Sequence, residues 1–184
     1  MYGTRFQSLE LSNSKKHISC LEFADRVMGP FMSVGKYLVY ATIVSIFVVF
    51  IWGAFLTGSG YGSACGVGGA FPVDRDWPYC EGSLSFPSDW PAQVEYIHRA
   101  LSVVATVLLI GSNLAVWRMK PRPHAAARAL LLALILLLAE LYLGGVVIKT
   151  SLDVVIGTIS LATATTIFGV LILAGDRLYL HERS

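Results

Sequence analysis

The residues best suited to chemistry in this sequence form the run EYIHR at positions 95–99. An apolar run, ALSVVATVLLIGSNLAVW, follows directly and is suited to lipid. On a helix the i, i+3 spacing places Glu95 and His98 on the same face, with Arg99 about 100° further round. Ionisable residues at membrane depth are expensive and usually mark a functional site. We therefore take Glu95, His98 and Arg99 as the candidate site.

The types of these three residues point to a haem site. Neutral imidazole is a common axial ligand of haem iron, and an arginine can hold a propionate through two hydrogen bonds. A carboxylate beside the ligand, such as Glu95, can take part in proton transfer. A second explanation stays open, namely that Glu95, His98 and Arg99 form an ordinary hydrogen-bonded cluster at the membrane interface.

A second ionisable residue, Glu140, interrupts the apolar run LLLAELYLGGVVIK. Counted from the end of its helix, Glu140 lies at a depth similar to that of His98. Gly144 and Gly145 follow one turn later, where a bare backbone allows a helix or a flat ring to approach closely. We assign Glu140 to the cofactor-binding site; a Glu140–Arg99 ion pair joining two helices is the alternative.

The elements that must position these residues are membrane-spanning helices. The chain of 184 residues is 55% hydrophobic and 14% charged, whereas soluble domains are roughly 25% charged. Four apolar stretches, 36–57, 93–117, 127–148 and 153–174, are long enough to cross a bilayer as helices. The runs are continuous rather than alternating, which disfavours a β-barrel. The predicted fold is all-α: a four-transmembrane-helix up-down bundle.

The distribution of lysine and arginine predicts the orientation of the bundle. Basic residues flank one end of the predicted helices: Arg5, Lys15, Lys16, Arg26, Lys36, Arg118, Lys120, Arg122, Arg128, Arg177 and Arg183. The loop 58–92 has only Arg75 as a basic residue, against four acidic ones. By the positive-inside rule both termini are cytoplasmic, and this loop faces outward.

The outward loop carries two cysteines, Cys65 and Cys80. A cysteine pair in an oxidising compartment is a candidate disulfide, and two free thiols are the alternative. The loop is rich in Gly, Ser and Pro and is too long for a simple connection, so we expect an ordered lid. The predicted regions are a cytoplasmic N-terminal segment 1–34 with a candidate interfacial helix, the transmembrane domain 35–176 and a cytoplasmic tail 177–184.

The last predicted helix contains the polar stretch TISLATATTIFG. Small hydroxylated residues are typical of tightly packed helix interfaces in membranes. The same residues would also form a flat wall against a porphyrin. His17, His124 and His181 lie outside the predicted spans, so His98 is the only histidine within them.

Four motifs in order resemble the haem A synthase family. They are GAFLTGSGYGSACG at 53–66, DWPYCEG at 76–82, EYIHR at 95–99 and LGG at 143–145. The resemblance implies that His98 is an axial haem ligand, that Glu95 is the catalytic glutamate and that Cys65 and Cys80 form the loop disulfide. Members of this family oxidise the methyl group of haem O to the formyl group of haem A. Typical members have two four-helix halves, one for the substrate haem and one for a haem b.

The chain departs from the family pattern in three places. It is half-size, an arginine often found before the TGSG stretch is absent, and the window 156–160 reads IGTIS where a second ligand histidine is expected. Glu140 also stands where the family has glutamine. The half size implies a homo-oligomer, most simply a dimer, or a second half-size subunit.

The resulting expectation is a haem A synthase-like oxidase of the plasma membrane, with haem O as substrate and haem A as product. Its expected partners are the lipid bilayer and a haem O synthase or terminal oxidase, without nucleic acid. A non-catalytic haem-binding or accessory subunit of a respiratory complex is the alternative. A b-type cytochrome is disfavoured, because one membrane histidine cannot supply two axial ligands.

Overall fold

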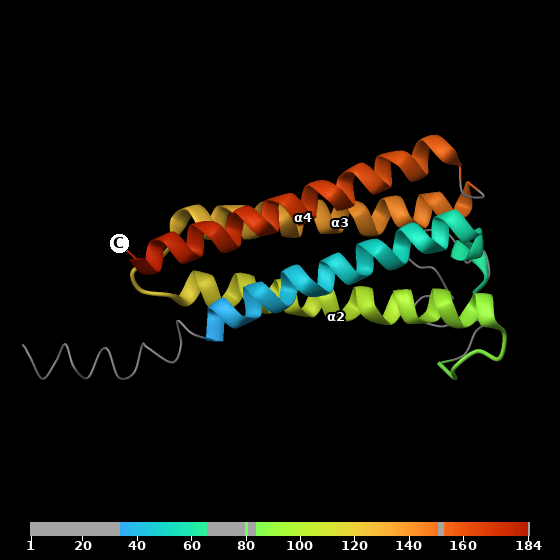
Figure 1. Cartoon of the computed structure of the whole chain (residues 1–184), viewed down its shortest axis with the longest axis horizontal. Coiled ribbons are helices and arrows are strands. Elements are labelled where there is room, and N and C mark those ends of the chain that lie inside the picture. The colour runs from blue at the N-terminus through green and yellow to red at the C-terminus, as the bar shows by residue number, and fades with distance from the viewer. Residues whose placement is uncertain (1–33, 66–79, 81–83, 151–152, 184) are drawn as a thin grey trace, which may run out of the picture.

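Four long helices make up most of the computed structural model, which describes residues 34–65, 80, 84–150 and 153–183. They are the first helix (Val34–Ser59), α2 (Trp90–Arg118), α3 (His124–Lys149) and α4 (Val154–Arg183). Figure 1 shows them running up and down along one common axis. All four are long and apolar enough to cross a membrane. The predicted four-helix bundle is confirmed, and the chain is a multi-pass membrane protein.

Local sequence explains where the helices begin. α2 starts at Trp90 with Pro91 in its first turn, where the missing proline N–H costs nothing. α4 is capped by Asp153, whose Oδ1 accepts hydrogen bonds from the backbone N–H of Val155 at 2.9 Å and of Ile156 at 3.1 Å. These starts agree closely with the predicted stretches.

The end of α4 differs most from the predicted stretch. The sequence predicted a span that ends at residue 174, but the helix continues to Arg183. Leu178 in the added turns is 2% exposed and belongs to the core, and the Arg183 guanidinium lies over the Tyr179 ring at 4.4 Å. Packing of these side chains extends the helix beyond its most apolar part.

The bundle consists of two helical hairpins. The first helix and α2 form one, and α3 and α4 form the other, drawn above it in Figure 1. Thr42 and Ser112 join the first helix to α2 by a buried hydroxyl–hydroxyl hydrogen bond of 2.8 Å. Phe47 and Phe168 join the first helix to α4, with ring centroids 5.3 Å apart. Each helix therefore has a fixed register against its neighbours.

The apolar core fills only part of the bundle. Its members run along all four helices, and the last ones toward the loop that carries the cysteines are Ile46, Ala105, Leu137 and Ile167. A separate small cluster of Cys65, Cys80 and Ala92 lies at the far end. Among the described residues, the layer between the two clusters is where the buried charged side chains lie.

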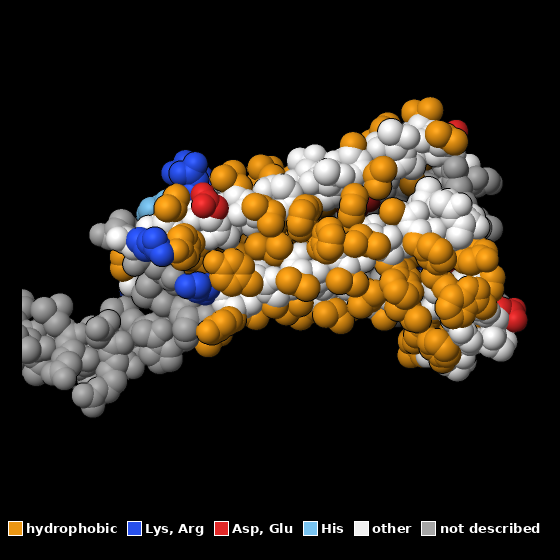
Figure 2. Space-filling view, viewed as in Figure 1, with side chains coloured by type: hydrophobic (Ala, Val, Ile, Leu, Met, Phe, Trp, Pro, Cys, Tyr) orange, Lys and Arg blue, Asp and Glu red, His pale blue; other side chains and the backbone are white. Residues whose placement is uncertain are grey.

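The two ends of the bundle differ in charge. Figure 2 shows lysine and arginine gathered at the end where α4 finishes, while hydrophobic side chains cover the middle of the molecule. We call this the basic end and the opposite one the disulfide end. The candidate interfacial helix in segment 1–34 and most of the expected lid lie outside the described residues.

Candidate functional site

A glycine-dependent turn brings the first helix back onto α2 at the disulfide end. The first helix ends at Ser59, and Gly60 has φ 75°, a left-handed conformation that favours glycine. The short 3-10 helix η1 (Tyr61–Ser63) follows and delivers Cys65 to the start of α2. The stretch TGSGYGSAC thus folds as a helix end, a turn and a docking residue.

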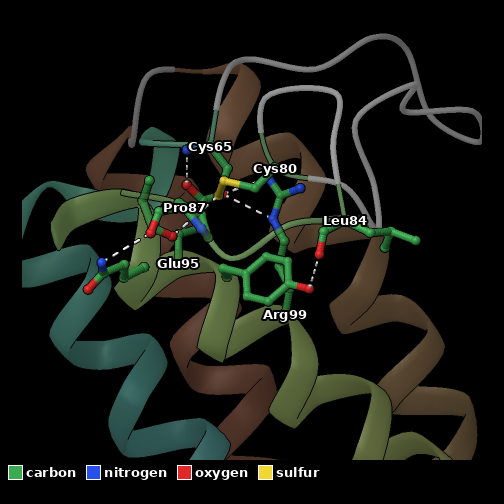
Figure 3. The surroundings of a disulfide bond; sticks show 9 residues. Cys65, Cys80, Leu84, Pro87, Glu95 and Arg99 are labelled. Carbon is green, nitrogen blue, oxygen red and sulfur yellow. Dashed lines mark hydrogen bonds and ion pairs between the residues drawn. A yellow bond between two sulfur atoms is a disulfide. The ribbon is translucent and has the colours of Figure 1, made fainter. Parts of the chain in front are cut away.

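Cys65 and Cys80 form a disulfide, with Cα atoms 4.7 Å apart. Both side chains are buried, and Ala92 of α2 packs against them. Figure 3 shows the disulfide above the start of α2, close to Glu95 and Arg99. The predicted pairing is confirmed.

The segment before α2 is also fastened to that helix. The Tyr96 hydroxyl donates to the carbonyl of Leu84 at 3.0 Å, and Gln93 Nε2 donates to the carbonyl of Pro87 at 3.0 Å. Figure 3 shows Leu84 and Pro87 beside the disulfide. On the other side, the indole of Trp52 donates to the carbonyl of Val94 at 2.9 Å. The first two turns of α2 are therefore held from several directions.

The Glu95 carboxylate lies at the centre of these contacts and is 2% exposed. Its Oε1 accepts hydrogen bonds from Arg99 Nη2 at 2.7 Å and Arg99 Nε at 3.2 Å. Its Oε2 accepts a hydrogen bond from the backbone N–H of Cys65 at 2.6 Å. Arg99 is itself 8% exposed, so this is a buried ion pair. The carboxylate thus connects α2 to the disulfide.

His98 takes no part in this cluster. Its ring lies against Gly53 of the first helix, where a Cβ would stand only 3.1 Å from His98 Cε1. Nδ1 is buried without a hydrogen-bond partner, and neither ring nitrogen bonds to any residue in the described ranges. Buried imidazoles normally satisfy their nitrogens by hydrogen bonds or by a metal. The His98 ring is therefore available as a ligand.

Glu140 on α3 is the other carboxylate of the layer, and its side chain is half-buried. The Ser160 hydroxyl of α4 donates to its Oε1, while its Oε2 is buried without a partner. The alternative Glu140–Arg99 ion pair is not formed, since Arg99 contacts Glu95 and Glu140 contacts Ser160. Sequence reasoning identified Glu140 but not its partner, because that contact depends on the relative register of α3 and α4.

Two sets of contacts give the depth of Glu140. On one side, Asn113 Nδ2 donates to the carbonyl of Leu130 at 3.2 Å, which fixes α2 against α3. α2 and α3 run antiparallel. Counting ten residues from this contact toward the disulfide end, forward on α3 and back on α2, places Glu140 level with Val103. α2 residues 98 and 103 are separated by roughly 7 Å along the axis at 1.5 Å per residue.

The other set of contacts runs through the first helix. The first helix and α4 also run antiparallel. Counting eight residues from the Phe47–Phe168 contact toward the disulfide end places Ser160 of α4 level with Phe55 of the first helix. Since His98 faces Gly53, Phe55 lies about level with Tyr96 of α2. The two sets therefore place the Glu140–Ser160 pair between residues 96 and 103 of α2. His98 and Arg99 lie within this interval, so polar side chains of α2, α3 and α4 share one layer of the bundle.

The hydroxyl-rich stretch of α4 contributes little else to this layer. Thr158, Thr163, Thr165 and Thr166 each donate to the carbonyl four residues earlier in their own helix. Such back-bonding satisfies a hydroxyl in an apolar setting. The Ser160 hydroxyl, in contrast, donates to a neighbouring helix, to Glu140 of α3.

The described residues fit a haem better than a metal ion held by side chains alone. They contain no group of three or more His, Cys, Asp or Glu that could hold such an ion. They do contain an imidazole without a hydrogen bond and a carboxylate oxygen without a partner in one layer, where the apolar core stops. A haem needs only one or two axial donors and an apolar surround.

Fold and site together define a multi-pass membrane protein with a buried histidine and carboxylate layer near one membrane face. Comparison with known families makes the assignment more specific. The profile of the cytochrome oxidase assembly protein family matches residues 29–172. The chain belongs to this family, and its resemblance to the haem A synthases is confirmed.

Several curated proteins are similar to parts of the chain. A Heme A synthase of Bacillus pumilus is 29% identical over 115 residues, covering 61% of this chain and 34% of that protein. A Heme A synthase of Symbiobacterium thermophilum is 34% identical over 73 residues, covering 40% and 21%. The chain thus spans about a fifth to a third of these relatives.

A relative of another name is also similar. A Protoheme IX farnesyltransferase 1 of Natronomonas pharaonis is 29% identical over 136 residues, covering 74% of this chain and 26% of that protein. No solved structure matches the chain.

Proposed function

We propose that this chain is a haem A synthase-type oxidase that converts the methyl group of haem O to the formyl group of haem A. Family membership supports a role in haem A biosynthesis. The observation that carries the specific proposal is the placement of Glu95 and His98 one turn apart on α2, with the His98 ring free of hydrogen bonds. In this proposal His98 ligates the iron of the substrate haem.

Glu95 is the proposed proton acceptor. Oxidation of the methyl to the formyl group takes up one water and releases four protons and four electrons, which two acceptors of the quinone class would balance. Both oxygens of Glu95 already accept hydrogen bonds, from Arg99 and from the Cys65 N–H. A carboxylate has about four lone-pair positions and these contacts occupy three, so Oε2 can still take a proton. Arg99 and the Cys65 N–H hold the carboxylate in place for this step.

The proposal extends to location and partners. The chain lies in the plasma membrane. Its basic end faces the cytoplasmic side and its disulfide end faces outward, in line with the positive-inside rule. A second four-helix unit, either another copy or a different half-size subunit, completes the assembly. The support for this pairing is that 11% to 28% of each apolar span is buried within one chain, which leaves surface for a second unit as well as for lipid.

A haem O synthase is the partner proposed to supply the substrate, and a terminal oxidase the partner to receive the product. Similarity to a protein named as a protoheme farnesyltransferase supports the first of these. The farnesylated haem is large and apolar, so transfer between neighbouring membrane proteins would avoid exposing it to water.

A non-catalytic haem-binding or accessory role is the second candidate. Ser160 favours it, because a serine stands in the window where family members carry a second ligand histidine. Under this role the layer would hold a haem, and no haem A would form.

Haem A formation in cells distinguishes the two functions. The chain is expressed in a strain that makes haem O and lacks its own haem A synthase, and the haems are extracted and identified by mass. We expect haem A with the unaltered chain, a loss of at least tenfold with Glu95→Gln, and no loss with the control Asp89→Asn. Haem A that persists with Glu95→Gln would refute the catalytic assignment. Haem bound to the chain without any haem A would favour the accessory role.

A further inference from the structure

We infer that Glu140 is the second axial donor to the haem iron, facing His98 from the opposite hairpin. This inference rests on the proposed function for the presence of a haem, and assigns a role to a carboxylate where the family pattern has no acid. The donor atom is Oε2 of Glu140, and Ser160 is its positioning residue.

His98 and Glu140 belong to different hairpins at one depth. His98 lies at the seam between α2 and the first helix, against Gly53. Glu140 lies at the seam between α3 and α4, where Ser160 bonds to it. The hairpins face each other across the bundle in Figure 1, and the helix registers place the Glu140–Ser160 pair within the interval 96–103 of α2, which contains His98. A flat group entering between the hairpins would meet an imidazole on one side and a carboxylate on the other.

The hydrogen bonds leave one atom on each side that can bind a metal. Ser160 occupies Oε1 of Glu140, which fixes the carboxylate, while Oε2 stays buried without a partner. A buried polar atom without a partner costs roughly 1–3 kcal/mol, so an unsatisfied atom calls for an explanation. Haem iron accepts anionic oxygen ligands as well as imidazole, as the tyrosine of catalases shows. An iron between Oε2 and the His98 ring would satisfy both groups.

The apolar core stops at this level, and small residues follow it on α3. The apolar core ends at Ala105 of α2 and Leu137 of α3, next to the polar layer. Gly144 and Gly145 lie one turn beyond Glu140, and a Cβ added at either would meet no atom within 4 Å. Small residues on a membrane helix allow close approach of a neighbour, such as the flat ring of a haem.

The inference predicts a specific spectrum for the haem-loaded protein. The purified chain in mild detergent is loaded with ferric haem b, and its absorption and electron paramagnetic resonance spectra are recorded. Histidine with carboxylate is a weak-field ligand pair, so we expect a mostly high-spin ferric haem. Glu140→His supplies a second imidazole at the same place and should convert most of the bound haem to the low-spin form.

Three further variants separate ligation from folding. Glu140→Gln keeps the size of the side chain and removes its charge, and should weaken ferric haem binding several-fold. Ser160→Ala frees Oε1 and should change the high-spin signal at unchanged haem content. Asp176→Asn, an exposed carboxylate on α4, is the matched control and should leave every spectrum unchanged.

The outcomes distinguish this inference from the function on which it rests. Haem that depends on His98 but gives the same spectrum in Glu140→Gln, Glu140→His and the unaltered chain would overturn the inference alone. A low-spin ferric haem in the unaltered chain would overturn it as well. The expected spin conversion in a protein that makes no haem A would uphold the inference and refute the catalytic function.

Discussion

At the scale of single residues, the site separates the side chains of His98 and Arg99, which are neighbours in the sequence. Arg99 turns back by one helical turn onto Glu95, while the His98 ring lies against Gly53 and its Nδ1 bonds to no residue that the structure describes. The i, i+4 spacing of Glu95 and Arg99 is a signal for this pair that sequence reasoning passed over in favour of a propionate contact. Arg99 as a propionate ligand stays a prediction.

The buried Glu95–Arg99 pair makes a first prediction. Arg99→Met removes the countercharge and leaves a buried carboxylate, so the free energy of unfolding should fall by about 3–5 kcal/mol. The double variant Arg99→Met with Glu95→Gln should recover part of this loss, because no uncompensated charge remains. Unfolding of the purified protein in detergent measures both. A double variant less stable than Arg99→Met would contradict a dominant role of the ion pair.

The contact between Gly53 and His98 makes a second prediction. Gly53→Ala places a Cβ 3.1 Å from His98 Cε1, so the ring must shift and haem affinity should fall several-fold. Gly111→Ala is the matched control, since a Cβ there meets nothing within 4 Å. The control should gain up to about 1 kcal/mol of helix stability without affecting haem. Equal haem affinity in the two variants would show that the position of the His98 ring is unimportant.

At the scale of elements, the sequence predicted the helices well and their contacts poorly. Continuous apolar runs indicate membrane spans because a bilayer leaves few other structures possible. The additional turns of α4 were missed because they are polar and depend on the burial of Leu178. The Ser160–Glu140 and Gly53–His98 contacts depend on helix register, which no local pattern in one sequence determines. The disulfide pairing was predictable because only two cysteines share the loop.

Helix packing near the basic end makes a third prediction. Gly175 of α4 is buried, and a Cβ there would meet Ile43 Cδ1 at 3.2 Å and Tyr40 Cε1 at 3.6 Å. Gly175→Ile should therefore separate α4 from the first helix and cost about 1–3 kcal/mol of stability. Gly169→Ile on the same helix is the control, because nothing lies within 4 Å of its added Cβ. Thermal unfolding that is equal for both variants would rule out close packing at Gly175.

At the scale of the whole molecule, the two halves of the bundle differ in the side chains that fill them. Toward the basic end an apolar core of mostly small and branched side chains joins the helices. Toward the disulfide end a polar layer and a disulfide-linked turn replace that core. An apolar half and a half with a polar layer agree with the haem site proposed at the disulfide end.

The central claim is that a haem binds in this layer against His98, and a haem titration tests it most directly. The purified protein, His98→Ala and the control His181→Ala are titrated with ferric haem, and bound haem is measured by its absorption. His181 lies at the basic end, where its Nε2 is 3.3 Å from the Pro121 carbonyl oxygen. We predict saturable binding that His98→Ala abolishes and His181→Ala preserves. Equal binding by all three proteins, or no binding by the folded unaltered chain, would contradict the account.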